Sequence, residues 1–123
     1  MPTRERVAAF VAMVESNRHV EAIEAFYHPH ASMQENQQPP RAGRDALVEG
    51  ERRMLARNRV HTHPADVILV DGDRSVVRWR FEFTPHEGGP TLLLEELALQ
   101  RWEGDRIVEE QFFYDPVQMR PPG

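Results

Sequence analysis

The chain has 123 residues, which suits one domain spanning residues 1–123 and gives enough length to bury a core without disulfides. Its fifteen basic residues, all of them arginine, face twenty acidic residues and leave a net charge of -5, which argues against a nucleic-acid partner. Cysteine and lysine are absent, and this excludes thiolate nucleophiles, zinc–thiolate sites and Schiff-base chemistry. If the protein is an enzyme, we expect carboxylates, histidines or tyrosines to perform acid–base chemistry without a cofactor.

The first half of the chain predicts three helices. Apolar residues at helical spacing indicate one helix over residues 3–16 and a shorter one over 17–27, which Pro29 ends. A turn through the histidines around Pro29 and a short extended piece over 31–35 follow. The third helix runs from about residue 43 to 58, and its inner stripe consists of Leu47, Val48, Met54 and Leu55.

The second half predicts a sheet of four strands. The strand segments are rich in branched and aromatic residues, and they cover residues 61–70, 74–84, 91–102 and 106–115. The short connections Asp-Gly-Asp, His-Glu-Gly-Gly-Pro and Glu-Gly-Asp between them are typical of hairpins, so the strands should be antiparallel. Helices followed by such a meander indicate an α+β fold with helices on one face of a curved sheet.

Location and assembly are also predicted from the sequence. The first ten residues contain no apolar run of the kind that a signal peptide needs, and no stretch approaches the roughly 20 apolar residues of a membrane helix. We therefore expect a cytoplasmic protein with no membrane partner. Strand 74–84 alternates Arg78, Arg80 and Glu82 on its outer face, and alternating charges suit a polar contact between two copies, so we expect a homodimer through this face.

Three stretches of the sequence carry a family resemblance. "EAIEAFYHPHASMQE", "PPRAGRDAL" and "LQRWEGDRIVEEQFFYDP" resemble the nuclear transport factor 2-like superfamily, in its SnoaL-like branch of ketosteroid isomerase and polyketide cyclase relatives. The resemblance covers nearly the whole chain and implies a cone-shaped barrel, in which three N-terminal helices pack on a curved antiparallel sheet around a pocket. It indicates the fold more than the activity, because the superfamily holds isomerases, cyclases, epoxide hydrolases, dehydratases and non-catalytic binders.

Strand alternation and the resemblance together indicate which residues line the pocket. Alternation puts the apolar face of 74–84, with Trp79 and Phe81, toward the pocket. It leaves both faces of 91–102 open, and the resemblance selects the face of Ala98. The same match puts Val108, Glu110, Phe112 and Tyr114 inside. The residues expected to contact a small apolar ligand are Met33, Trp79, Phe81, Glu96, Ala98, Glu110 and Phe112.

Glu35 is the candidate general base. The resemblance places it where ketosteroid isomerases carry their catalytic base, and it places Tyr27 at a pocket aromatic. A carboxylate in an apolar pocket has a raised pKa and can move a proton next to a carbonyl group. We expect Glu35 beside Tyr27 and Trp79, with Arg52 or Arg53 as the cation to check. The alternative is a solvated Glu35 at the pocket mouth.

The chain also departs from the isomerase pattern. The oxyanion tyrosine of that enzyme corresponds to a position near Val11, and its protonated carboxylic acid corresponds to Ala98, so the steroid-isomerase oxyanion hole is missing. Tyr27 or Tyr114 would then donate the hydrogen bond, or Glu96 or Glu110 would supply the second polar group.

Two functions remain open on the sequence alone. The first is a cofactor-free isomerase, cyclase or lyase that uses a pocket carboxylate as its base. The second is a non-catalytic binder of an apolar metabolite or an assembly partner. A buried carboxylate within hydrogen-bond reach of a second polar group inside the cavity would favour the enzyme. Carboxylates confined to the rim would favour the binder.

The histidines form two His-x-His pairs, His28 with His30 and His61 with His63. Alternate residues of an extended chain share a face, as a metal chelate requires, and Glu35 would be a nearby carboxylate for the first pair. A proline inside the first pair and another after the second make extended geometry doubtful. We therefore expect no intrinsic metal.

Overall fold

A computed structural model describes residues 1–120 of the chain. The helices are α1 Arg4–Glu15, α2 His19–Phe26 and α3 Arg44–Arg57. The strands are β1 Tyr27–Glu35, β2 Arg41–Ala42, β3 Asn58–Thr62, β4 Ile68–Asp71, β5 Arg74–Pro85, β6 Leu92–Glu103 and β7 Arg106–Phe113. A short 3-10 helix, η1 Pro116–Met119, follows the last strand. No helix in the described part is long and apolar enough to cross a membrane.

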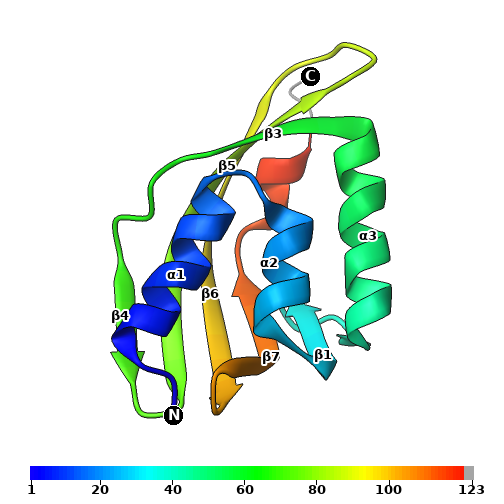
Figure 1. Ribbon diagram of the computed structural model, residues 1–123. Helices are drawn as coiled ribbons and strands as arrows, with labels where there is room; N and C mark the ends of the chain where they lie inside the picture. The colour runs from blue at the N-terminus through cyan, green and yellow to red at the C-terminus, as the bar shows by residue number, and fades with distance from the viewer. Residues whose placement is uncertain (121–123) are drawn as a thin grey trace.

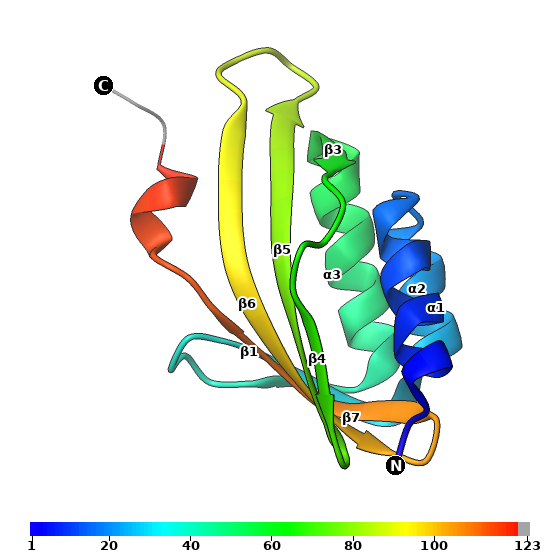
Figure 2. The same ribbon diagram turned by 90° about the vertical axis from the view of Figure 1, so that its left-hand side faces the viewer.

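The three helices lie together on one face of a curved sheet. Figure 1 views the molecule from the side of the helices, and Figure 2, turned by 90°, shows that all three stay on the same side of β5 and β6. The strand order is β2-β1-β7-β6-β5-β3, and β4 pairs with the first residues of β5. The predicted α+β fold with helices on one face is therefore confirmed.

The sheet is mixed, because one of its strand pairs is parallel. The predicted hairpins β5–β6 and β6–β7 are antiparallel, whereas β1 runs parallel to β7. This pairing arises because β1, from the first half of the chain, joins the free edge of the last strand of the meander. It places Tyr27, at the start of β1, next to Ile107 of β7.

Two predicted boundaries are wrong, and a proline lies at each. The turn expected at Pro29 is part of β1, where the pairing register shifts between Tyr27 and Ser32. The strand expected over 61–70 is interrupted after Thr62, and its two parts, β3 and β4, pair with different ends of β5. Pro64 has no backbone N–H to continue a ladder, which accounts for the interruption.

The core has an aromatic centre that fixes the helices on the sheet. The Phe10 ring of α1 lies 5.5 Å from the ring of Phe26, 6.1 Å from that of Trp102 and 6.3 Å from that of Trp79. The contacts with the two tryptophans are edge-to-face, the geometry that aromatic pairs prefer. Burial of these rings excludes water from the space between α1 and the sheet.

Burial along β6 shows which of its two faces points into the interior, a choice that alternation had left open. Leu94, Glu96, Ala98, Gln100 and Trp102 are all buried on the inner face, as the resemblance indicated. The intervening residues face outward, and Leu93 and Leu97 are exposed among them. The inner face of this strand therefore carries polar groups into the interior.

Candidate functional site

A cavity of about 460 Å³ lies between the helices and the inner face of the sheet. Most of its wall is apolar or aromatic, yet four carboxyl groups also line it: Glu35, Glu51, Glu96 and Glu110. A small number of polar groups in an apolar, concave wall is the usual composition of a small-molecule site. The cavity is therefore the candidate site.

The structure brings most of the predicted site residues together around this cavity. Ala98 is fully buried on the inner face of β6, between Glu96 and Gln100, and is absent from the cavity wall. The others all line the cavity: Tyr27, Met33, Glu35, Trp79, Phe81, Glu96, Glu110, Phe112 and Tyr114. The Trp79 and Phe81 rings stack with their centres 5.6 Å apart, and both residues belong to the aromatic part of the cavity wall.

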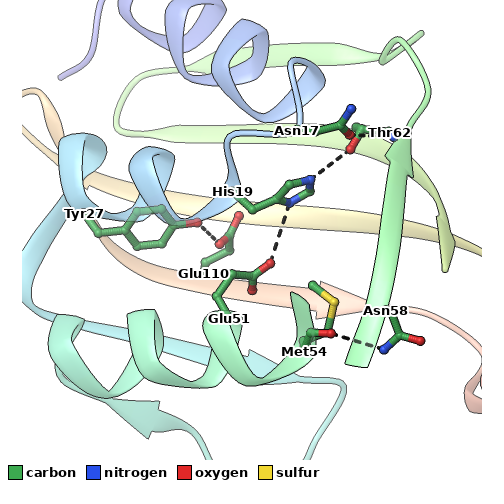
Figure 3. Close-up of polar contacts among 8 residues, drawn as sticks. All are labelled: Asn17, His19, Tyr27, Glu51, Met54, Asn58, Thr62 and Glu110. Atoms are coloured by element: carbon green, nitrogen blue, oxygen red, sulfur yellow. Dashed lines mark hydrogen bonds and ion pairs between the residues drawn. The ribbon is translucent and has the colours of Figure 1, made fainter. Parts of the chain in front are cut away.

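Glu110 is the most deeply held of the four carboxyl groups. It is 2% exposed on β7, and each of its oxygens accepts a hydrogen bond. The Tyr27 hydroxyl donates to Oε1, as Figure 3 shows, and the Gln100 amide donates to Oε2 over 2.7 Å. Burial raises the pKa of Glu110 to about 7, although the hydrogen bonds from Gln100 and Tyr27 act in the opposite direction.

A chain of hydrogen bonds behind Glu110 fixes this arrangement. The Trp102 indole can only donate, and it donates to the Ser75 hydroxyl oxygen over 2.8 Å. Ser75 in turn donates to Oε1 of Gln100 over 2.6 Å, which leaves the Gln100 amide nitrogen to donate to Glu110. Because the chain starts at a donor-only group, every proton in it points toward Glu110. The carboxyl group is thereby held as an acceptor.

Glu96 lies on the same inner face of the sheet and has different surroundings. It is 8% exposed, and none of the side-chain hydrogen bonds among residues 1–120 involves its carboxyl group. Burial raises its pKa to about 8, and the neighbouring Glu110 adds to the shift. At neutral pH this group is mainly the neutral acid, which can donate a hydrogen bond into the cavity.

A third carboxyl group, Glu51, faces the cavity from α3. Its Oε1 lies 3.6 Å from Nδ1 of His19, and His19 Nε2 lies 3.0 Å from the Thr62 hydroxyl (Figure 3). Burial raises the pKa of Glu51 to about 7 and lowers the pKa of His19. Burial thus favours the neutral form of both groups, and their contact is not a permanent ion pair.

Glu35 lies at the cavity mouth, at the end of β1. Its side chain is 48% exposed, and its carboxylate lies 3.8 Å from the Arg41 guanidinium. Asn36 ties this corner to the end of β7, because its side-chain oxygen accepts from the Tyr114 backbone N–H over 3.0 Å. Partial burial and then the charge of Glu35 raise the pKa of the Tyr114 hydroxyl. Glu35, Arg41 and Tyr114 form the mouth cluster.

The expected burial of Glu35 is therefore wrong. Glu110, not Glu35, lies beside Tyr27 and accepts the hydrogen bond of its hydroxyl group. In the parallel pairing of β1 with β7, Met33 lies opposite Glu110, whereas Glu35 lies opposite Phe112. The expected cations also differ. The cation beside Glu35 is Arg41, whereas Arg52 and Arg53 pair on the surface with Glu24 and Glu49.

Sequence reasoning missed four polar residues of the interior: His19, Glu51, Thr62 and Ser75. Glu51 had a signal, because it lies within the helical stripe that begins with Leu47 and Val48 and ends with Met54. Ser75 shares the inward parity of Trp79 on its strand, so alternation would have found it. Gln100 shares the face of Ala98 and was expected to point inward, but it was given no role. His19 occupies the first position of α2, four residues before the buried Ile23.

Among residues 1–120, one cluster has the composition and spacing of a metal site: His61, His63 and Glu82. It lies on the outer face of the sheet and takes no part in the cavity wall. His28 and His30 lie near the start of β1, and Glu35 lies at its other end, so the three do not gather.

The sequence profile of the SnoaL-like domain matches residues 7–110. A comparison with curated protein sequences gives no match. Among solved structures, a protein of Mesorhizobium loti provisionally named a SnoaL-like polyketide cyclase has a TM-score of 0.81 at 22% identity, over 93% of this chain and 100% of that one. A Mycobacterium tuberculosis epoxide hydrolase has a TM-score of 0.76 at 15% identity, over 94% of this chain and 84% of that one.

A third solved structure carries a small molecule. It is a hypothetical protein of Catenulispora acidiphila with a ketosteroid isomerase-like fold, crystallised with trimethylamine, and it has a TM-score of 0.75 at 17% identity over 92% of this chain and 87% of that one. These similarities agree in fold across proteins with different names, so they confirm the architecture and leave the activity to be argued from the site. Since the profile match covers most of the chain, this protein belongs to the SnoaL-like domain family.

Proposed function

We propose that the protein is a cofactor-free enzyme that removes and returns a proton next to a carbonyl group of a small, largely apolar molecule. The observation that carries this proposal is the pairing of two unlike carboxyl groups in one cavity. Glu110 is a buried acceptor held by Tyr27 and Gln100, and Glu96 is a buried acid that has no side-chain hydrogen-bond partner within residues 1–120. Buried acids whose surroundings differ in this way are typical of acid–base catalysis.

The two carboxyl groups divide the work according to their pKa values. Near neutral pH a large part of Glu110 is ionised, because its pKa is about 7, and the ionised form can accept a proton. Glu96, with a pKa of about 8, is mostly protonated under the same conditions. A carboxylic acid kept neutral by apolar surroundings can donate a hydrogen bond to a developing oxyanion. In ketosteroid isomerases the resemblance places a protonated carboxylic acid, the hydrogen-bond donor, at the position of Ala98. Glu96 lies two residues from Ala98 on the same face, so in this proposal it supplies that donor instead.

In the proposed reaction, Glu110 takes the proton from the carbon next to the carbonyl group. The electron pair of that C–H bond moves into the enolate, and Glu96 stabilises the oxygen by its hydrogen bond. Where the enolate is conjugated with a neighbouring double bond, return of the proton from Glu110 to the far carbon of that dienolate gives an isomer. Alternatively, the enolate carbon attacks an internal carbonyl group and closes a ring, and the alkoxide formed by opening that C=O π bond takes the proton from Glu110. Trp79 and Phe81 supply apolar contacts for the body of the substrate.

Glu35 is the competing base, and its exposure at the mouth favours a different part for it. In this proposal the mouth cluster binds the polar end of a substrate whose apolar body fills the cavity. The non-catalytic alternative, a binder of an apolar metabolite, has less support because the carboxyl groups are not confined to the rim.

The test uses a surrogate substrate, since proton removal can be followed without the natural one. β-Tetralone, an apolar enolisable ketone, is incubated with the protein in deuterated water, and loss of its α-proton signal is followed by NMR. Wild type should accelerate the exchange, with a maximum between the two pKa values of about 7 and 8. Glu110→Gln should abolish the acceleration. Saturable binding of the ketone without exchange would support the binder instead.

Glu96→Gln gives a second, independent readout. The amide keeps a hydrogen-bond donor at every pH but has no proton to lose, so the activity should no longer fall on the alkaline side. Glu35→Gln is the matched control at the mouth. If Glu35→Gln abolished exchange and Glu110→Gln did not, the base would be Glu35 and this assignment would be wrong.

We also propose a homodimer through the outer face of the sheet. Leu93 and Leu97 of β6 are each 44% exposed there, opposite Glu82 and Arg78 of β5. Exposed apolar side chains beside alternating charges suit a contact between two copies. Light scattering at micromolar concentration should give the mass of a dimer, and Leu97→Glu should give that of a monomer. A wild-type protein that is monomeric under these conditions would contradict the proposal.

A further inference from the structure

We propose that His61, His63 and Glu82 form a binding site for a divalent transition metal ion of the zinc type, on the outer face of the sheet and separate from the cavity. Their ligand atoms, one from each residue, all lie within 4.8 Å of one another. Two imidazoles and one carboxylate are a common protein ligand set for zinc, with the remaining position taken by water. The proposal is independent of the function proposed for the cavity.

The backbone brings the three side chains together. His61 lies in β3 directly opposite Glu82 of β5. Thr62, between the histidines, points inward to His19, so its two neighbours point outward. The His63 backbone N–H donates to the Arg80 carbonyl over 3.0 Å, which keeps the chain paired one residue beyond the end of β3. The extended geometry that Pro64 made doubtful is therefore present at this pair.

The side chains are already close to a chelating arrangement. The rings of His61 and His63 have their centres 4.9 Å apart, and His63 Nε2 lies 2.6 Å from a carboxylate oxygen of Glu82. Two ligand atoms on a tetrahedral zinc ion lie about 3.4 Å apart, given zinc–nitrogen bonds of about 2.0–2.1 Å. The ligand atoms of the three residues lie within 4.8 Å of one another, so a rotation of the exposed His61 ring would bring its nitrogen to the spacing that zinc requires. The ion would take the place of the proton between His63 and Glu82.

The other His-x-His pair provides a contrast within the same chain. The ring centres of His28 and His30 lie 5.4 Å apart, but Nδ1 of His28 accepts the His30 backbone N–H over 3.0 Å. That bond occupies one ring nitrogen of His28. Within residues 1–120, no third histidine or acidic side chain joins this pair as a possible ligand. It therefore serves as a matched control of the same residue types.

The test is a zinc titration of the full chain, carried out without an affinity tag because a tag would bind the same ion. Isothermal calorimetry should give one zinc ion per chain, and Mg²⁺ should give no heat because it prefers oxygen ligands. His61→Ala and Glu82→Gln should each weaken zinc binding by at least about tenfold, since even mutation of groups that support metal ligands costs this much. The double variant His28→Ala/His30→Ala should bind as wild type does.

A second readout separates a built site from weak surface binding. Co²⁺ in place of zinc should show the intense visible absorption of a four-coordinate ion in wild type and lose it in Glu82→Gln. Circular dichroism checks that each variant is folded, and the mass is measured alongside because the predicted dimer uses the same face. Absence of zinc binding by wild type would overturn the proposal. The proposal would also be overturned if the double variant His28→Ala/His30→Ala lost zinc binding while His61→Ala kept it.

Discussion

Glu110 and Glu35 line one cavity from two neighbouring strands, and they differ mainly in depth. Met33 is the β1 neighbour of Glu110, and Glu35 lies only two residues further along β1. The carboxyl group of Glu110 is enclosed by Tyr27 and Gln100, whereas that of Glu35 is half-exposed beside Arg41. Correspondence to a family motif selects Glu35, whereas desolvation and hydrogen bonding select Glu110. The comparison shows that a carboxylate is a candidate base through its surroundings more than through its place in a motif.

The largest expected effect comes from removing the inner carboxyl group. Glu110→Gln should lower ketone exchange by about 10²- to 10⁴-fold, the usual contribution of a positioned acid or base. Glu35→Gln should leave the rate within about tenfold of wild type, because the mouth carboxylate transfers no proton in this account. NMR rates for the two variants, with thermal melts to confirm folding, make the comparison. If both variants lost the same share of the exchange rate, the buried Glu110 and the mouth residue Glu35 would contribute equally, and the comparison would fail.

The next effect is on stability as a function of pH. The pKa of Glu96 is raised in the folded protein from 4.5 to about 8, so the folded state binds this proton more tightly than the unfolded state. The stabilisation from protonated Glu96 is thus fully present below about pH 4.5 and is lost as the pH rises through about 8. Each pKa unit corresponds to roughly 1.4 kcal/mol in the free energy of unfolding. Urea unfolding at about pH 5.5 and about pH 8.5 should therefore show a loss of stability that Glu96→Gln reduces. If Glu96→Gln lost as much free energy of unfolding between these two pH values as wild type does, Glu96 would not be the buried group that binds the proton.

A smaller effect is expected from the chain of hydrogen bonds that supports Glu110. Ser75→Ala removes the acceptor of the Trp102 indole and the donor to Gln100, both in the buried interior. Leaving buried polar groups without partners should cost about 1–3 kcal/mol of the free energy of unfolding. Thr84→Ala, which breaks an exposed hydroxyl pair with Thr91, is the matched control and should change stability by no more than about 0.5 kcal/mol. Chemical denaturation measures both, and a costlier Thr84→Ala would reverse the ranking.

The smallest effect is expected at the mouth. The Glu35–Arg41 pair is half-exposed on both sides, so Arg41→Gln should cost at most about 1 kcal/mol of stability at low salt, and less when salt screens the pair. Thermal melts at two salt concentrations check this. A loss as large as that of Ser75→Ala would mean that the mouth cluster is part of the structural core.

Periodicity and turn signals predicted the fold because they depend on local rules. The helices, the order of the strands from β5 to β7 and the inward face of β5 all follow from residue spacing and hairpin turns. The parallel pairing of β1 with β7 was missed because it joins residues from opposite ends of the chain. No local signal in either strand specifies that partner.

The residues of the cavity were predicted better than their environments. Alternation and the resemblance found Tyr27, Glu96 and Glu110, but which carboxyl group is buried depends on the β1–β7 register. Glu51 was missed because a charged residue in an apolar helical stripe was not counted as inward-facing. Periodicity locates a side chain on a face, whereas its depth and partners depend on the tertiary structure.

If Glu110 and Glu96 are the base and the acid of this cavity, both carboxyl groups titrate near neutral pH, and carboxyl-labelled NMR tests this most directly. Protein with ¹³C at the glutamate side-chain carboxyl positions is titrated, and Glu110→Gln and Glu96→Gln assign the two signals. We expect apparent pKa values of about 7 and about 8 for the Glu110–Glu96 pair, shared between the coupled groups. Two signals that instead titrate near the ordinary glutamate value of 4.5 would contradict it and leave the cavity without its acid and base.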